Sequence, residues 1–315
     1  MRPPEIFASY ALHLGPRGAV DDQIKPIFSG GVGRSGTTII GRILRKHSKV
    51  FVGSPFEIKF ITESYGLIDL VFGVREFLPT QISRKGYWLS KLSSHDSTRI
   101  RYLKFKKRIE NDWWIRTNRL DRESGLHRAL SKTTLNKLLK DLEASLDTPL
   151  EAARQFTFGY VKSHRKWQGQ RYWMDTSPPN IMYSDYIYRI FPEAKFVEMR
   201  RDPFDNIASV LKEPWGPNDH RKAILWWRDR VGLATSAQKS IPIESSITLE
   251  LEDLVKNKRS ETYQRLINHI GLEDEVEMRQ YFDLEVTFER AHIGRWRSDF
   301  ADPDKFESLF NQLTK

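Results

Sequence analysis

The sequence predicts an α/β protein built as a single domain around a central, mostly parallel β-sheet. Short apolar runs suited to buried strands alternate with longer amphipathic stretches suited to helices, and this alternation is typical of parallel sheets. The chain has 315 residues, 39% of them hydrophobic, with nine Trp and eighteen Phe. Such a chain can bury a large core, and it is too apolar and too aromatic to be disordered.

The predicted elements follow in chain order. Residues 1–24 carry Pro and Gly, and we expect an extended lead-in. The strand candidates are the short apolar runs, which lie at residues 26–28, 50–52, 171–175, 195–199 and 245–251. Between the first two strands, a glycine-rich turn is followed by apolar residues at helical spacing over 39–44. After the second strand, the periodicity predicts a helix that begins just past Pro55.

Residues 75–165 are mostly polar, with helical periodicity and no convincing strand. We expect a helical insertion on the sheet, within one domain that spans residues 1–315. Inside it, residues 84–108 hold nine Lys or Arg against a single acid, Asp96. Such a stretch is either a site for an anionic ligand or a solvated basic helix, which is the commoner use of a charge run.

The formal net charge of +10 predicts an anionic partner, such as a nucleotide, a sulfated or phosphorylated molecule, a polysaccharide, a nucleic acid or a membrane surface. The absence of Cys excludes disulfides and thiolate chemistry, and the eight His are scattered, which argues against a metal site. No apolar run reaches the ~20 residues of a membrane helix, and the N-terminus lacks a signal-peptide core. We therefore expect a soluble, cytoplasmic protein without a transmembrane segment.

The turn GVGRSG at residues 31–36 joins the first strand to a helix. Such a turn presents backbone N–H groups at a helix N-terminus, where the helix dipole also favours negative charge. It therefore predicts a phosphate site made of Gly33, Arg34, Ser35, Gly36, Thr37 and Thr38. The spacing from Gly31 to Gly36 imitates a Walker A loop, but Thr37 stands where a nucleotide triphosphatase carries Lys. The cation is Arg34 instead; a tight turn that binds nothing is the alternative.

With its basic residue followed by Ser-Gly-Thr-Thr, this loop resembles the 5′-phosphosulfate loop of sulfotransferases that use 3′-phosphoadenosine-5′-phosphosulfate (PAPS). Arg34 replaces the Lys of many members. The resemblance implies a P-loop-like, three-layer fold and the transfer of a sulfuryl group from PAPS to a hydroxyl or amine, without a metal. Arg34 and the loop N–H groups would stabilise the leaving phosphate, and the hydroxyls of Thr37 and Thr38 would donate to it.

The sequence around Arg201 predicts a buried strand followed by a helix, with Asp202 as N-cap and Pro203 as the first helical residue. Arg201 then lies at the carboxyl end of a strand, where open α/β sheets bind ligands. Sulfotransferases place an Arg and a Ser eight residues apart on the 3′-phosphate, and Arg201 and Ser209 resemble that pair. Arg200 falls on the opposite face and receives a lesser, structural role. Alone, such a junction is equally well explained as an ordinary strand-to-helix turn.

A third segment, made of Gly294, Arg295 and Trp296, resembles the late Gly-Lys-Trp or Gly-Arg-Trp run that covers the cofactor in many sulfotransferases. The resemblance implies that this segment and Arg297 contact the 3′-phosphate or the adenine. The alternative is a surface Arg and Trp pair that packs on the C-terminal helix.

An acceptor that attacks sulfur in line needs a base opposite the leaving phosphate. Glu57 is the candidate catalytic base, because many glycan and tyrosyl-protein sulfotransferases carry a Glu in a similar place after the second strand. A Glu that stabilises the dipole in the first turn of a helix is the alternative. His220 and His292 are weaker candidates, since lone histidines are mostly structural.

The segment WMDTSPPN resembles a family segment that commonly reads Lys-Thr-Pro or Lys-Ser-Pro, whose Lys lies near the transferred group. Here Thr176 stands at the Lys position. The second catalytic cation is therefore unassigned, and either Lys59 takes that role or Arg34 acts alone.

Two other functions stay open. One is a P-loop kinase or hydrolase with Asp175 as a metal ligand, against which the missing loop Lys counts. The other is a non-catalytic basic module for nucleic acid or glycan, which leaves the phosphate motifs unexplained. For a sulfotransferase, nucleic acid is not the expected partner. The acceptor, whether small molecule, glycan or peptide, is not identified by the sequence, and we expect residues 75–165 to select it.

Overall fold

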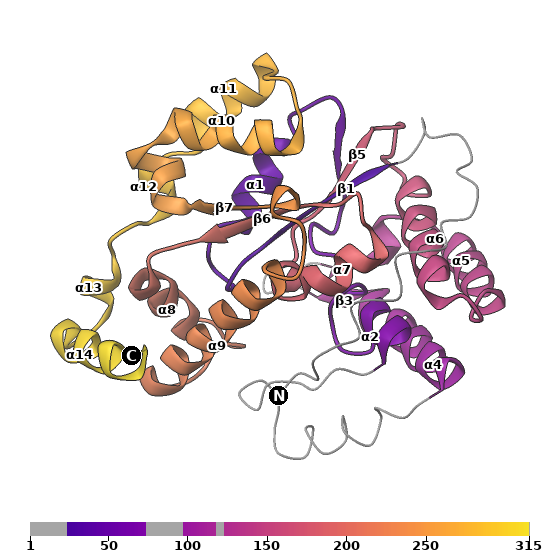
Figure 1. The fold of residues 1–315 in the computed structure, drawn as a ribbon, viewed down its shortest axis with the longest axis horizontal. Helices are drawn as coiled ribbons and strands as arrows, with labels where there is room; N and C mark the ends of the chain where they lie inside the picture. The colour runs from indigo at the N-terminus through magenta and orange to yellow at the C-terminus, as the bar shows by residue number, and fades with distance from the viewer. Residues whose placement is uncertain (1–23, 74–96, 118–122, 315) are drawn as a thin grey trace.

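The computed structural model describes residues 24–73, 97–117 and 123–314 (Figure 1). Five parallel strands form the central sheet in the order β2-β5-β1-β6-β7. Their bounds are β1 Lys25–Gly30, β2 Val50–Val52, β5 Tyr172–Asp175, β6 Lys195–Arg200 and β7 Ser246–Glu250. These strands coincide with the five predicted apolar runs, so the predicted α/β fold with a parallel sheet is confirmed.

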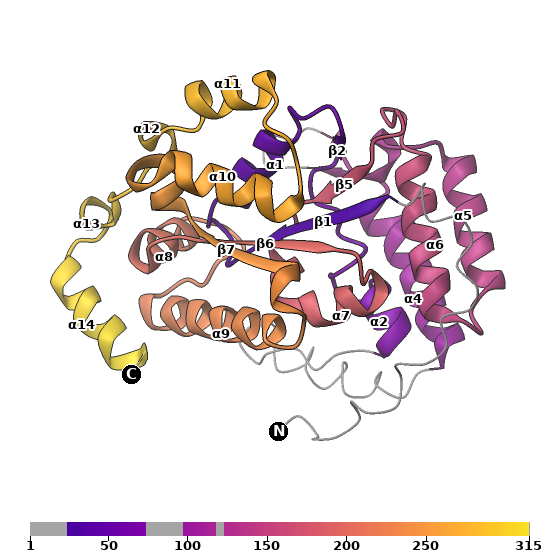
Figure 2. The same ribbon diagram turned by 45° about the horizontal axis from the view of Figure 1, so that its top comes forward.

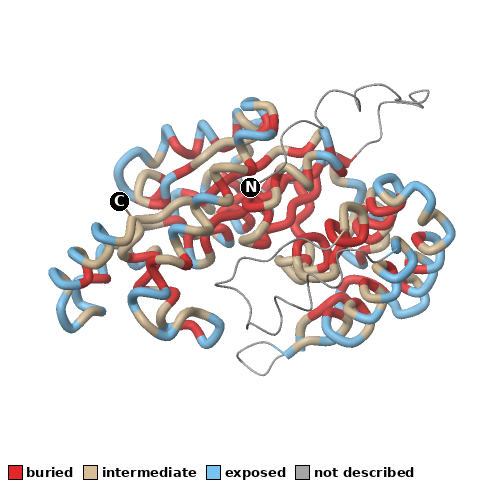
Figure 3. The backbone as a smooth tube through the Cα atoms, turned by 60° about the horizontal axis from the view of Figure 1, so that its bottom comes forward, coloured by how far each residue is buried: buried red, intermediate tan, exposed pale blue. Residues whose placement is uncertain are grey.

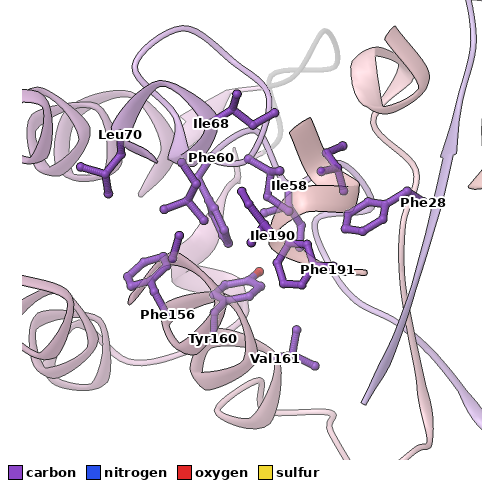
Figure 4. Packing of buried hydrophobic residues seen from close by; sticks show 14 of the residues in the cluster. Phe28, Ile58, Phe60, Ile68, Leu70, Phe156, Tyr160, Val161, Ile190 and Phe191 are labelled. Carbon is purple, nitrogen blue, oxygen red and sulfur yellow. The ribbon is translucent and has the colours of Figure 1, made fainter. Parts of the chain in front are cut away.

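The central strand β1 is buried along nearly its whole length, as expected in the middle of a parallel sheet. Figure 3 shows the buried parts of the chain, in red, gathered in the interior of the molecule. Its successive residues Ile27 and Phe28 point into two different hydrophobic clusters. The ring of Phe28 packs against Trp173 of β5 and Phe196 of β6, with centroids 5.6 and 5.7 Å away. Figure 4 shows this cluster extending from Phe28 to Phe191 and on to the helices beyond.

Helices cover both faces of the sheet and make the expected three layers (Figure 2). The face that carries Ile27 is covered by α1 Thr37–Leu44, η5 Asp253–Asn257, α10 Arg259–Ile270 and α11 Val276–Glu285. The face that carries Phe28 is covered by η3 Pro178–Tyr183, α7 Ser184–Ile190, α9 His220–Gln238 and the helices of the insertion. The remaining helices are α8 Pro203–Leu211, η4 Ile243–Ser245, α12 Phe288–Ala291, α13 Trp296–Asp299 and α14 Pro303–Thr314.

The described part of residues 75–165 is mostly helical. Its helices are α4 Thr98–Arg108, η1 Ile109–Trp113, η2 Leu126–Arg128, α5 Lys132–Ala144 and α6 Pro149–Lys162. One feature differs from the prediction, because β3 (Arg116–Thr117) and β4 (Glu123–Ser124) form a two-residue antiparallel ladder. Phe105 and Phe156 belong to the same hydrophobic cluster as Phe28, so the insertion and the sheet share a core. The extent of the single domain stays a prediction.

The basic stretch at 84–108 is described only from residue 97 onward. In that part, α4 buries Tyr102 and Phe105, while Arg99 and Arg108 form ion pairs with Glu143 and Asp112. The described residues of the stretch therefore act as one wall of the core with a charged outer face. Binding of an anion by residues 84–96 lies outside the described residues.

The helix predicted just past Pro55 is wrong in its start, since α2 spans only Leu67–Phe72. The reason lies in hydrogen bonds to the end of β5. The Ile58 N–H donates to the Asp175 carboxylate at 2.8 Å, and the Phe56 carbonyl accepts from Thr176. These backbone groups are thus unavailable for intrahelical bonds, and the segment follows the sheet edge instead.

No helix among the described residues combines the length and the apolar composition needed to cross a membrane.

Candidate functional site

The carboxyl ends of the five parallel strands meet at a cavity of about 1560 Å³. Each strand is followed by a segment that contributes residues to the cavity wall. These segments are 33–39 after β1, 57–64 after β2, 178–183 after β5, 201–209 after β6 and Leu251 after β7. This is the edge at which open α/β sheets bind ligands. Among the described residues, ten Lys or Arg side chains line the cavity against four Asp or Glu, so it favours an anionic ligand.

The glycine loop after β1 requires glycine at two positions, Gly31 and Gly36, for different reasons. A Cβ atom on Gly31 would lie 2.4 Å from the carbonyl oxygen of Met199. Gly36 has a φ of 96° and is the N-cap residue of α1, so no side chain of its own accepts from the first-turn N–H groups. These groups and the positive end of the helix dipole are therefore available to an anion.

The loop residues predicted from the sequence do not all line the cavity. Gly33, Arg34, Gly36, Thr37 and Thr38 do so. Ser35 is 2% exposed, lies beneath the loop next to Gly31, and is absent from the cavity wall. The reason is the tight turn, which aims successive side chains in opposite directions.

Arg34 connects the loop to the second predicted phosphate site. It has a φ of 72°, the left-handed backbone conformation that is uncommon for a residue with a side chain. Its Nε donates to the hydroxyl of Ser209 at 3.0 Å, and the same atom lies 3.5 Å from the carboxylate of Glu213. The two sites inferred separately from the sequence are therefore in direct contact, although 175 residues separate Arg34 from Ser209.

Arg201 lies immediately after β6, and its side chain is 9% exposed. It donates to the carbonyl oxygen of His292 at 2.8 Å and to that of Arg34 at 3.4 Å, and lies 3.8 Å from the Asp205 carboxylate. Burial lowers the pKa of the Arg201 guanidinium from its ordinary value, while Asp205 partly offsets that effect. Asp202 caps α8 through the N–H groups of residues 204 and 205, as predicted.

Asp205 also fixes the late segment over this site. Its two carboxylate oxygens accept from the N–H groups of Gly294 at 2.6 Å and Trp296 at 3.0 Å. Arg295 lines the cavity, whereas Trp296 is 8% exposed and stacks on Phe204 with ring centroids 4.6 Å apart. The Trp296 ring therefore packs α13 against α8. This packing differs from the surface pair on the C-terminal helix that was the alternative, and the role of this segment in nucleotide binding stays a prediction.

Arg200 and the two alternative histidines have other surroundings. The Arg200 guanidinium lies 3.0 Å from the Glu198 carboxylate and does not line the cavity. His220 contacts the rings of Phe300 and Phe306 away from the site. His292 lines the cavity, with its carbonyl oxygen bound by Arg201.

Glu57 lines the cavity on the β2 side, in a non-helical segment, so the helix-dipole explanation does not apply to it. Lys59 lies 3.7 Å from its carboxylate and 3.1 Å from that of Glu63. Thr176, at the expected Lys position, is 1% exposed and donates its hydroxyl to the Phe56 carbonyl oxygen at 3.0 Å. Lys59 thus forms an ion pair with Glu57, while Thr176 binds the backbone at Phe56 next to it.

Asp175 is fully buried beneath the same segment. Its carboxylate accepts from the N–H of Ile58 at 2.8 Å, the amide of Asn180 at 2.8 Å and the hydroxyl of Ser177 at 3.1 Å. Burial raises the pKa of Asp175 to about 6, although these hydrogen bonds oppose the shift. A buried carboxylate with three donors holds protein segments together, and it does not line the cavity as a metal ligand would. Among the described residues, no group of three His, Cys, Asp or Glu could hold a metal.

Several residues that line the cavity were not identified from the sequence, among them Arg116, Trp215, Trp226, Arg230 and Leu251. Trp215 covers the loop, because a Cβ atom on Gly33 would lie 3.0 Å from its ring. Trp226 and Arg230 are four residues apart on α9, a spacing that is visible in the sequence. Only the fold shows that this side of α9 faces the cavity.

The layers and the glycine loop define a P-loop-like α/β protein with a cationic ligand site at the carboxyl edge of its sheet. The chain belongs to the sulfotransferase family, whose sequence profile matches residues 26–276. The match includes the glycine loop, Glu57, Arg201 and Ser209, and ends before Gly294. The prediction of a sulfotransferase is thereby confirmed.

One solved structure shares the fold at low sequence identity, and others are similar to this chain over most of its length. The sulfotransferase domain from the Synechococcus PCC 7002 olefin synthase is 14% identical, with a TM-score of 0.50 over 95% of this chain and 96% of that domain. The sulfotransferase domain from the curacin biosynthetic pathway is 18% identical (TM-score 0.48; 92% and 90% covered). Sulfotransferase STF9 from Mycobacterium avium is 13% identical (TM-score 0.47; 92% and 76%). No curated protein matches the chain.

The buried carboxyl group of Asp175 predicts a pH dependence of stability. Its pKa in the folded protein, about 6, is raised above the ordinary 3.8, so its contribution to stability is fully present below pH 3.8 and is lost as the pH rises through about 6. The loss amounts to roughly 3 kcal/mol in the free energy of unfolding. When the free energy of unfolding is measured in urea between pH 4 and pH 7, the Asp175→Asn variant should not show this decrease. Asp304→Asn, at a carboxylate 91% exposed, is the control that keeps it. Parallel pH profiles for Asp175→Asn and the wild type would contradict the assignment.

Proposed function

We propose that this sulfotransferase uses PAPS and transfers its sulfuryl group to a hydroxyl or amine acceptor by in-line displacement. The observation that carries the proposal is the contact between the two phosphate motifs, made by Arg34 and Ser209 in one cavity. A nucleotide with phosphate groups at both ends needs two such sites close together. A nucleoside triphosphate, with all its phosphates at one end, does not.

The residues present fit such a nucleotide. The Nε atom of Arg201 is buried and has no hydrogen-bond partner within the described part of the chain. A buried guanidinium with a free donor is unfavourable until an anion completes its hydrogen bonds. The 3′-phosphate would bind Arg201 and Ser209, and the 5′-phosphate would bind Thr37, Thr38 and the N–H groups of the loop. Arg295 would contact the nucleotide from the late segment.

The chemistry expected of this chain's own residues follows from the proposed binding mode. PAPS supplies the activated sulfuryl group. Arg34 and the first-turn N–H groups of α1 would stabilise the charge that develops on the leaving 5′-phosphate. Glu57 would accept the proton of the acceptor as its oxygen or nitrogen bonds to sulfur, and Lys59 beside it would stabilise the equatorial sulfuryl oxygens. No step in this scheme requires a metal.

Arg201→Ala should weaken the binding of adenosine 3′,5′-bisphosphate. Loss of charge-assisted hydrogen bonds predicts a dissociation constant raised roughly 10- to 150-fold in calorimetry. Arg200→Ala is the matched control, since it removes an equal charge one residue away, from an ion pair with Glu198 outside the cavity. Equal affinities of Arg201→Ala and the wild type, or an equal loss in Arg200→Ala, would exclude Arg201 from the site.

Glu57→Gln should spare nucleotide binding and lower turnover by roughly 10²- to 10⁴-fold, because the base is lost while the shape of the side chain is kept. The measurement is transfer of radiolabelled sulfur from PAPS to an acceptor found by screening. Glu63→Gln removes the other carboxylate bound to Lys59 and serves as control. If turnover falls equally in Glu57→Gln and Glu63→Gln, the loss comes from the changed surroundings of Lys59, and Glu57 is not the base.

A further inference from the structure

One wall of the cavity belongs to neither phosphate motif. Its helical part is the side of α9 that presents Lys222, Leu225, Trp226 and Arg230. Next to it lie Pro178, Pro179, Met182 and Tyr183 of η3, which follows β5. In Figure 2, α9 runs under the sheet beside α7, the helix that continues η3. In the sheet β5 lies between β1 and β2, so this wall adjoins both the glycine loop and the Glu57 segment.

Arg230 is the unusual residue of this wall. Its guanidinium lies 3.8 Å from the centre of the Trp226 ring, which fixes the plane of the group. Its Nη1 atom is buried and has no hydrogen-bond partner in the described residues. Asp229, the neighbouring acid, is engaged by Arg228 at 3.2 Å. Burial lowers the pKa of Arg230 to about 10, so the group is still a cation at neutral pH.

In contrast to Arg230, two other cations on this side of the cavity have acidic partners. Lys59 is bound to Glu57 and Glu63, and Lys222 to Asp219 at 3.0 Å. Arg116 of β3, which is half-buried, also lines the cavity. A buried, charged donor without an acid partner is costly, and a bound oxyanion removes that cost. Trp226 is only 6% exposed, and its stacked ring holds the Arg230 guanidinium in a fixed orientation at the cavity wall.

We propose that Arg230, stacked on Trp226 and assisted by Arg116, is a binding site for an oxyanion group of the acceptor. The acceptor then carries a carboxylate, phosphate or sulfate in addition to the hydroxyl or amine that is modified. This inference rests on the proposed function, which assigns the glycine loop and Arg201 to the nucleotide and leaves this wall to the acceptor.

The test is a titration of the full chain, saturated with adenosine 3′,5′-bisphosphate, with acetate, inorganic phosphate and inorganic sulfate at constant ionic strength. Calorimetry should detect saturable binding of at least one anion to the wild type. The strongest of the three identifies the group that the acceptor carries. Arg230→Gln should raise the dissociation constant of that anion roughly tenfold or more. Arg230→Lys keeps the charge but loses the planar guanidinium, so its dissociation constant should lie between those of the wild type and Arg230→Gln.

Arg221→Gln is the matched control, because Arg221 is an exposed arginine of α9 that does not line this cavity. It should bind the anion as the wild type does, and all variants should keep their affinity for the bisphosphate. The inference is overturned if no anion binds to the bisphosphate complex, or if Arg230→Gln binds it as tightly as the wild type. Failure of the bisphosphate itself to bind would instead overturn the proposed function, and the Arg230→Gln comparison on the free chain would still decide the anion site.

Discussion

The contacts of the buried Arg201 guanidinium hold together the segments that form the ligand cavity. It binds the carbonyl oxygens of Arg34, in the loop after β1, and of His292, in the segment before α13, and it lies beside Asp205 of α8. Asp205 in turn holds Gly294 and Trp296. One arginine therefore joins three segments that are far apart in the sequence. It does so with donors directed at carbonyl oxygens, while its Nε has no hydrogen-bond partner in the described part of the chain.

The cavity concentrates cations at the end of a sheet whose core is almost entirely apolar. Within the described ranges, ten cationic side chains line the cavity against four acids, and a nucleotide with several negative charges would compensate this excess of positive charge. The Glu57 side is arranged differently. There the backbone is fixed by Asp175 and Thr176 from below, and Glu57 shares a lysine with Glu63. The strand order thus places the cationic glycine loop and Arg201 at one region of the cavity and the carboxylate of Glu57 at another.

The sequence predicted what local rules control and missed what tertiary contacts decide. The five strands, the glycine turn and the Asp202 cap follow from apolar runs, glycine spacing and capping preferences, and all are present. The helix expected past Pro55 is absent because Asp175 and Thr176 bind its backbone, which no local pattern reveals. The burial of Ser35, the packing of Trp296 on Phe204 and the cavity-facing side of α9 likewise depend on residues distant in the chain.

In the proposed function, one cavity holds a nucleotide that is phosphorylated at both its 3′ and 5′ positions. The most direct measurement is a calorimetric comparison of adenosine 3′,5′-bisphosphate with ATP plus magnesium on the wild-type chain. The two contacting phosphate sites around Arg34 and Ser209 predict clearly tighter binding of the bisphosphate, with no dependence on magnesium. Tighter binding of ATP, or a requirement for magnesium, would contradict the proposed site for a 3′,5′-bisphosphorylated nucleotide.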